Sequence, residues 1–318
     1  MPKVSIIIPV YGVEKYIEKC ARSLFEQTLD DIEFLFIDDC TQDRSINVLK
    51  RVLEDYPHRQ DQVKIHKMER NSGQAAVREW GILNASGDYI INCDSDDWVT
   101  HDMYHQMYEK AIEDNADIVV CDYNISNGES VLRRIKGCES TDKVTMIKRL
   151  LLQRDPWSLC NKLFKRTVCT KDLIFPKGNM GEDMVLTTQM LLNGGKVAYI
   201  ARPLYNYFLN QESITHQACE EKKMSNFWQN KENADIVYGL ILAKDQRKQY
   251  FDAIVSNKWY IKKMLWNTAF DRPKRQLWKS VYEEINTKVM ISNYISFKDK
   301  IRFVLTYLCL FPDQTKSR

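Results

Sequence analysis

The stretch YIINCDSDD, residues 89–97, joins a short apolar run directly to an acidic turn. Residues 89–93 are typical of a buried β-strand, because the run is brief and rich in aromatic and β-branched side chains. Asp94, Asp96 and Asp97 then follow within four residues. Like charges held this closely repel one another, so the turn predicts a cation beside it.

The first 122 residues alternate between strand-like and helix-like patterns. Strands are predicted at 4–10, 33–37, 63–67, 89–93 and 118–121, and helices at 14–27, 45–56, 74–85 and 101–115. This alternation indicates βαβ units in a mostly parallel sheet with helices on both faces. Ligands of such sheets bind beyond the carboxyl ends of the strands, so the residues that follow each strand form the candidate site.

Polar and aromatic residues follow four of these strands. They are PVYG at 9–12, DDCT at 38–41, ERNSG at 69–73 and DSDD at 94–97, with Arg78 inside the next helix. The first turn lacks the glycines of a dinucleotide-binding fingerprint, and no P-loop pattern is present. A dehydrogenase and a P-loop enzyme are therefore excluded, and a nucleotidyltransferase with a glycine-rich phosphate loop is disfavoured.

An Asp-x-Asp turn at a strand end can present two carboxylates to one divalent ion. Mg²⁺ and Mn²⁺ prefer such hard oxygen ligands and are often shared with substrate phosphates. We therefore predict Asp96 and Asp94 as ligands of Mn²⁺ or Mg²⁺, which would neutralise a diphosphate leaving group. The alternative is an ordinary acidic turn, but the Asp38-Asp39 pair at the neighbouring strand end favours the metal.

Composition changes along the chain predict two domains. Residues 123–218 contain scattered glycines with helices expected at 142–153 and 183–192, whereas 219–318 is charged, helical and rich in Trp. The tail carries 19 Lys/Arg against 11 Asp/Glu, although the whole chain has a net charge of only +3. We predict a domain at 1–218, with halves 1–122 and 123–218, and a helical extension at 219–318.

The cellular setting is constrained by what the sequence lacks. Nine cysteines are scattered without CxxC spacing, which indicates a reducing cytoplasm and neither a zinc site nor a disulfide framework. No run reaches the ~18 apolar residues of a membrane span, and the apolar run at 4–10 is too short for a signal peptide. No nucleic-acid partner is predicted.

Several motifs in order resemble glycosyltransferase family 2. They are VSIIIPVY (4–11), SLFEQT (23–28), FIDD (36–39), NSG (71–73), ASGDYI (85–90) and DSDD (94–97), and the resemblance covers about residues 3–216. It implies the GT-A fold, an α/β architecture with a Rossmann-like nucleotide-binding mixed sheet flanked by helices, followed here by a C-terminal helical extension. It also implies inverting sugar transfer from a nucleotide diphospho-sugar.

The resemblance implies a role for most residues at the strand ends. Tyr11 would pack on a uracil, and Asp39 would accept a hydrogen bond from the base N–H. Asp94 would contact ribose or metal, while Asp97 is interpreted as a cap of the next helix. Tyr11 as a plain packing aromatic stays open. The complete nucleotide-sugar set is Pro9, Tyr11, Glu14, Asp38, Asp39, Asn71, Arg78, Asp94 and Ser95.

The second half supplies the catalytic base according to the same resemblance. Asp183, in the Gly181-Glu182-Asp183 motif before an apolar helix, would take the proton of the acceptor hydroxyl. Residues 205–208 and 213–215 resemble a flexible segment that closes over the diphosphate, but Phe208 stands where relatives often carry Arg. His216 is a candidate third metal ligand. The acceptor or loop set is Glu182, Trp157, Lys162 and Ser213, with Trp157 as a core residue the alternative.

The tail at 297–311 is basic and amphipathic. A helix of this kind can lie at an anionic membrane surface, or it can pack on its own body or on a second copy in a homodimer. The sequence as a whole predicts a cytoplasmic, metal-dependent transferase, peripheral at the inner face of the plasma membrane. It would move a sugar from a UDP-sugar to a saccharide or lipid-linked saccharide in bacterial surface polysaccharide synthesis. A catalytically silent binding module and a membrane-recruited scaffold are the alternatives.

Overall fold

A computed structural model describes residues 1–209, 220–243, 247–266 and 272–308. The chain divides into two compact units, one of residues 1–146 and 155–217, the other of residues 147–154 and 218–318. The division falls inside the helix α5 (Lys143–Leu151). The domain boundary at 218/219 stays a prediction.

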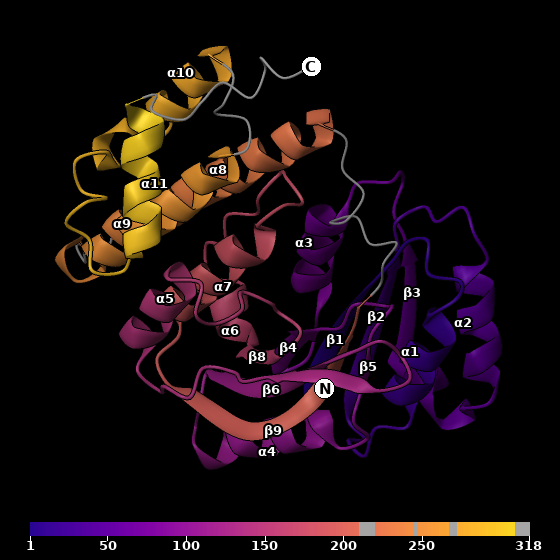
Figure 1. Cartoon of the computed structure of the whole chain (residues 1–318). Helices are drawn as coiled ribbons and strands as arrows, with labels where there is room; N and C mark the ends of the chain where they lie inside the picture. The colour runs from indigo at the N-terminus through magenta and orange to yellow at the C-terminus, as the bar shows by residue number, and fades with distance from the viewer. Residues whose placement is uncertain (210–219, 244–246, 267–271, 309–318) are drawn as a thin grey trace. The chain divides into compact units, whose positions relative to one another are not determined.

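The first unit is built on a single mixed sheet (Figure 1). Its strands run in the order β3-β2-β1-β4-β8-β6-β9-β5, with β7 paired to β6. The first four are parallel, whereas β8 is antiparallel to both β4 and β6. The strands are β1 (Val4–Val10), β2 (Ile32–Asp38), β3 (Val63–Lys67), β4 (Tyr89–Asn92), β5 (Trp98–Val99), β6 (Ile118–Ser126), β7 (Val131–Ile135), β8 (Lys162–Lys165) and β9 (Val197–Phe208).

Helices cover both faces of this sheet. The main core joins alternate residues of β1, such as Ile6 and Ile8, to side chains of α1, α2 and α4. On the opposite face α3 lies so close that a Cβ added at Gly81 would be 2.5 Å from Ile7 Cγ2, so glycine is required there. The helices are α1 (Ile17–Phe25), α2 (Ser45–Glu54), η1 (Pro57–Gln62), α3 (Gln74–Asn84), α4 (Met103–Glu113), α6 (Arg166–Cys169) and α7 (Glu182–Asn193).

The α/β GT-A fold with a mixed sheet and a helical C-terminal region is confirmed. The expectation of a mostly parallel sheet holds for β1 to β4 and for the pair β6·β9, and it is wrong for the other pairs. The pairs β4·β8, β6·β8, β6·β7 and β5·β9 are antiparallel. The strands of these pairs are short, or polar residues interrupt their apolar runs. Most of them pair with strands that lie far away in the sequence.

The second unit is helical, with α8 (Glu220–Ala243), α9 (Arg247–Met264), α10 (Arg272–Ser280), η3 (Glu283–Ile285) and α11 (Phe297–Tyr307). Its core contains an aromatic cluster in which the rings of Trp259, Trp278 and Phe303 contact one another edge-on or tilted. The buried Lys262 ammonium donates to the carbonyls of Lys279 and Val281. Across the described ranges, no helix has the length and apolar character that crossing a membrane requires.

Candidate active site

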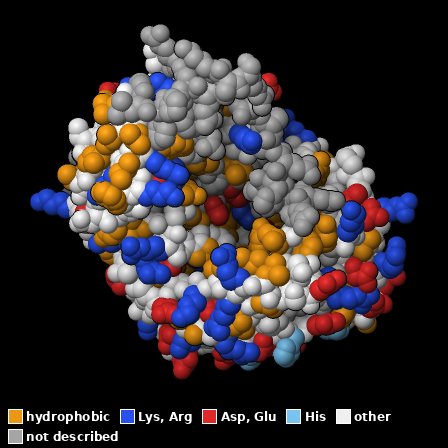
Figure 2. Space-filling view, viewed as in Figure 1, with side chains coloured by type: hydrophobic (Ala, Val, Ile, Leu, Met, Phe, Trp, Pro, Cys, Tyr) orange, Lys and Arg blue, Asp and Glu red, His pale blue; other side chains and the backbone are white. Residues whose placement is uncertain are grey.

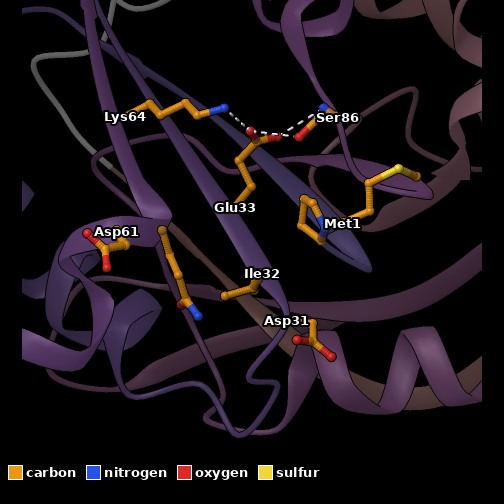
Figure 3. Close-up of a pocket in the computed structure, with 9 residues that line it drawn as sticks. Met1, Asp31, Ile32, Glu33, Asp61, Lys64 and Ser86 are labelled. Atoms are coloured by element: carbon orange, nitrogen blue, oxygen red, sulfur yellow. Dashed lines mark hydrogen bonds and ion pairs between the residues drawn. The ribbon is translucent and has the colours of Figure 1, made fainter.

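A pocket of about 290 Å³ lies at the amino ends of β1 and β2, and it is not the expected site. Figure 3 shows Glu33 in it, bonded to Lys64 and Ser86. Burial opposes ionisation of Glu33, but hydrogen bonds from Lys64, Ser5 and Ser86 outweigh it and lower the pKa of that carboxyl. These partners join β1, β2, β3 and the turn before β4, so the network is structural. Ligands of such a sheet bind at its other edge.

At the carboxyl edge, Asp39 organises the turn that follows β3. Its Oδ1 accepts the Ser72 N–H at 2.7 Å, and its Oδ2 accepts the Gly73 N–H at 2.8 Å. Asp38 accepts the Thr41 N–H at 2.8 Å, as expected of a residue that braces its own turn. Each carboxylate oxygen has a second lone pair, so Asp39 can still receive a donor from a bound base.

Around the end of β1, a second acid holds the loop that carries Tyr11. Tyr11 is 50% exposed, which leaves its ring available for stacking. Asp43 accepts the Glu14 N–H and both donors of Ser45, while Glu14 accepts the Arg44 N–H. Burial opposes ionisation of Asp43, but these hydrogen bonds lower its pKa. Sequence reasoning missed Asp43, although the D-x-x-x-D spacing of Asp39 and Asp43 was a signal.

The acidic turn after β4 alternates between buried and part-exposed positions. Ser95 and Asp97 are buried, whereas Asp94 and Asp96 are partly exposed. The two predicted metal ligands therefore share the exposed side of the turn. Asp97 accepts hydrogen bonds from the Tyr205 hydroxyl and the Phe208 N–H of β9. Its interpretation as a helix cap is wrong, because β5 follows it and α4 begins only at Met103.

The Tyr205 hydroxyl anchors both ends of this turn, since it donates to Asp97 and accepts the Asp94 N–H at 3.1 Å. Burial, together with Asp96 and Asp94, raises the pKa of Asp97 well above its usual range. Tyr205→Phe removes both bonds from a fully buried site, and we expect a loss of about 1–3 kcal/mol in unfolding free energy. Urea unfolding measures the loss in unfolding free energy, and Tyr108→Phe on α4 serves as the control. Equal urea midpoints would contradict the anchoring role.

Arg78 is the cation that the clustered acids require. Its buried guanidinium forms ion pairs with Asp94, at 3.0 Å, and with Glu182. Burial disfavours the charge on Arg78, but Asp94, Glu182 and Asp183 keep its pKa above the ordinary arginine value. Gln74 also donates to Asp94 Oδ1 at 3.2 Å. The structure thus places Arg78 between the acidic turn and α7. Its role in binding the nucleotide-sugar stays a prediction.

Glu182 and Asp183 open helix α7, where the helix dipole favours negative charge. Gly181 precedes them with φ +82°, a left-handed conformation that suits glycine. Asp183 Oδ1 accepts the Met184 N–H at 2.8 Å. Burial raises the pKa of both carboxyls, although Arg78 acts against it. Asp183 therefore lies near the acidic turn and has a raised pKa. Both properties suit a general base.

The segment before α7 also contacts the residues that follow β3. Asn179 Oδ1 accepts the Ala75 N–H at 3.1 Å, and a Cβ at Gly73 would be 2.4 Å from Asn179 Nδ2. Asn179 was missed, because nothing in its local sequence indicates a partner about 100 residues earlier. Asn179 links the turn after β3 to the loop that precedes α7, the helix that carries Asp183.

Lys162 and Trp157 have structural contacts. The buried Lys162 ammonium donates to the carbonyls of Pro156 and Ser158 and to Asn161 Oδ1, and burial lowers its pKa to about 8. Trp157 is 9% exposed, and its carbonyl accepts the Thr187 hydroxyl. These contacts favour the core alternative for Trp157. The acceptor roles of both residues stay predictions.

Residues 205–208 belong to strand β9 and pair with β6 and β5, so their interpretation as a flexible segment is wrong. Phe208 packs on the rings of Tyr16 and Trp98. Ser213 and His216 lie outside the described residues.

Within the described part of the chain, no group of three or more His, Cys, Asp or Glu is arranged to hold a metal. A divalent ion that substrate phosphates also hold needs only one or two carboxylates from the protein. Asp94 and Asp96 would provide these two carboxylates.

The mixed sheet, with linked acids at its carboxyl edge, has the architecture of the GT-A class. A model described as glycosyl transferase family 2 matches residues 5–170. The chain belongs to glycosyltransferase family 2.

Individual relatives agree with this family. The glycosyltransferase GlyA of Streptococcus pneumoniae is 30% identical over 235 residues, which are 69% of this chain and 32% of GlyA. The chain therefore spans about a third of that relative. The structure of S. aureus TarS 1-349 with UDP-GlcNAc has a TM-score of 0.61 at 14% identity, covering 96% of this chain and 89% of TarS 1-349. The structure of mannosyltransferase PcManGT from Pyrobaculum calidifontis, in complex with GDP-Man and Mn²⁺, has a TM-score of 0.53 at 14% identity. The match covers 96% of this chain and 87% of PcManGT.

Proposed function

We propose that this enzyme transfers a hexosyl or N-acetylhexosaminyl group from a UDP-sugar to a saccharide or lipid-linked saccharide hydroxyl, with inversion. One observation carries the proposal. The Arg78 guanidinium pairs with Asp94 on the acidic turn and with Glu182, the neighbour of Asp183. The acidic turn that would face the leaving diphosphate and the first residue of α7, which precedes the proposed base, are therefore held together by one buried cation.

In the proposed reaction, the acceptor oxygen attacks the anomeric carbon as the bond from that carbon to the diphosphate breaks. The hydroxyl proton passes to the Asp183 carboxylate, and the electron pair leaves with UDP. A single displacement inverts the anomeric centre, so one base on the face opposite the diphosphate is enough. Arg78 holds Asp94 and Glu182 in position through its ion pairs, and Glu182 directly precedes the base.

The preference for uridine rests on two residues at adjacent strand ends. Tyr11 presents a half-exposed ring after β1, and Asp39 lies buried after β2 with lone pairs left for a base N–H. The neighbours in fold hold UDP-GlcNAc in one case and GDP-Man in the other. The fold alone therefore accepts either nucleotide, and the choice depends on these side chains.

A divalent Mn²⁺ or Mg²⁺ ion belongs to the same proposal. Asp96 and Asp94 would hold it from the part-exposed side of the turn. When bound, the ion supplies positive charge to a diphosphate leaving group. Asp94 would share its carboxylate with Arg78, because one of its oxygens already accepts from that side chain.

We place the reaction in the cytoplasm at the inner face of the plasma membrane, in bacterial surface polysaccharide synthesis. Two relatives support the part of this proposal that concerns polymer synthesis. The matches include a poly(ribitol-phosphate) beta-glucosyltransferase and the poly(ribitol-phosphate) beta-N-acetylglucosaminyltransferase TarS. Both names give poly(ribitol-phosphate), an anionic polymer, as the substrate. A homodimer stays a prediction.

A donor screen tests the proposed function. Thermal shift and donor hydrolysis would be measured across UDP-, GDP- and dTDP-sugars with and without Mn²⁺. We expect UDP-sugars to give the largest shift, with hydrolysis that needs Asp183. Binding without any hydrolysis would favour a silent nucleotide-binding module, and no binding of any donor would reject the proposal.

A further inference from the structure

Helix α11 exposes a stripe of hydrophobic side chains that nothing in the proposed reaction uses. Phe297 is 78% exposed, Ile301 45% and Leu308 57%. Since one residue turns an α-helix by about 100°, these three side chains lie within about 40° of one another. They form a line about 17 Å long. We call Phe297, Ile301 and Leu308 the α11 stripe.

Packing holds this stripe outward. The opposite side of α11 carries Phe303 and Thr306, which are buried. The Phe303 ring contacts Trp259 at 5.7 Å and Trp278 at 5.6 Å between ring centroids. A rotation that buried the stripe would expose Phe303, so the exposed face follows from the core of the second unit.

Basic residues flank the stripe on both sides. By helical spacing, Lys298 lies on one side of it and Lys300 on the other. The acid of this helix, Asp299, is turned inward and forms an ion pair with Lys263 at 3.1 Å. In Figure 2, hydrophobic side chains with Lys and Arg among them gather where Figure 1 places α11. The outward face of α11 is thus apolar along its centre and cationic at its edges.

We propose that the α11 stripe docks on an anionic lipid surface, with Phe297, Ile301 and Leu308 at the acyl boundary and the flanking lysines at the headgroups. This is the geometry of a helix that lies in a membrane interface. A second copy of the chain fits less well, because a symmetric contact would bring two cationic edges together and the outward face of α11 offers no acid to pair with them. The charge pattern selects lipid with a net negative headgroup.

Vesicle flotation of the full chain, without nucleotide, tests this proposal. We expect binding to vesicles of phosphatidylcholine with phosphatidylglycerol, weaker binding at high salt, and little binding to phosphatidylcholine alone. Lys298→Gln with Lys300→Gln should weaken binding about fivefold per lysine removed. Phe297→Ser with Ile301→Ser should weaken it at least tenfold.

Two matched variants serve as controls. Leu83→Ser changes a leucine on α3 that is 61% exposed, and Lys50→Gln with Arg51→Gln changes two exposed cations on α2. Both should bind anionic vesicles as the parent chain does. Since no donor is present, failure of the transferase proposal would leave these results unchanged.

Three outcomes would overturn the proposal. One is the absence of binding to anionic vesicles, and another is binding that the stripe and lysine variants do not alter. The third is a stripe variant that changes the oligomeric state, measured by light scattering, while vesicle binding persists. That result would assign the stripe to a second copy of the chain.

Discussion

Asp183→Asn is expected to lower kcat by about 10²–10⁴-fold, the usual contribution of a positioned general base. An amide has nearly the same shape as the carboxylate but cannot take the acceptor proton. The Met184 N–H, now bonded to Asp183 Oδ1, can bond to the amide oxygen instead. UDP affinity should therefore change little, while steady-state transfer measured by UDP release nearly disappears.

The pH profile gives this prediction a second readout. Burial raises the pKa of Asp183, so the carboxyl becomes protonated, and the base is lost, at a pH above the usual aspartate value of about 3.9. In the parent enzyme, kcat should rise with pH through this raised pKa. The residual activity of Asp183→Asn should lack that acid limb.

Stability should move in the opposite direction from activity. Because the folded chain binds the Asp183 proton more tightly than the unfolded chain does, the ionised carboxylate costs stability at neutral pH. The asparagine variant should melt at the same temperature as the parent or slightly above. Asp172→Asn, an exposed acid in the preceding loop, is the control and should keep full activity. A folded Asp183→Asn variant with the kcat of the parent would contradict the assignment.

Asp96→Asn is expected to abolish most of the gain in activity that Mn²⁺ provides, a loss of about 10²–10³-fold. The estimate corresponds to several kcal/mol of charge stabilisation at the leaving group. The amide keeps one neutral oxygen but removes the negative charge that holds a divalent ion. Activity and UDP affinity would be titrated against Mn²⁺ in both proteins.

Asp61→Asn is the matched control for residue 96, because Asp61 lines the pocket at the opposite edge of the sheet. It should leave the Mn²⁺ titration unchanged. If Asp96→Asn behaved in the same way, the divalent ion would have other ligands or no part in the reaction. Arg78 would then be the principal cation facing the diphosphate.

Much of the first half of the fold is predictable from local patterns. Strands β1 and β3 have the predicted bounds, and α2 and α3 begin at the predicted residues. Central parallel strands are buried on both faces and therefore appear as continuous apolar runs. Strands β8 and β9 were not predicted, because β8 is only four residues long and the burial of β9 varies along its length.

The sequence by itself determined that three strand ends bring Tyr11, Asp39 and the acids at 94–97 to one edge, because parallel strands share a direction. Only the tertiary structure decided which partner each charge has. Arg78 binds Asp94, 16 residues away, and Glu182, 104 residues away, while Asp97 anchors β9 and caps no helix. Local propensity reaches only a few residues along the chain. The pairing of buried charges depends on which distant segments exclude water together.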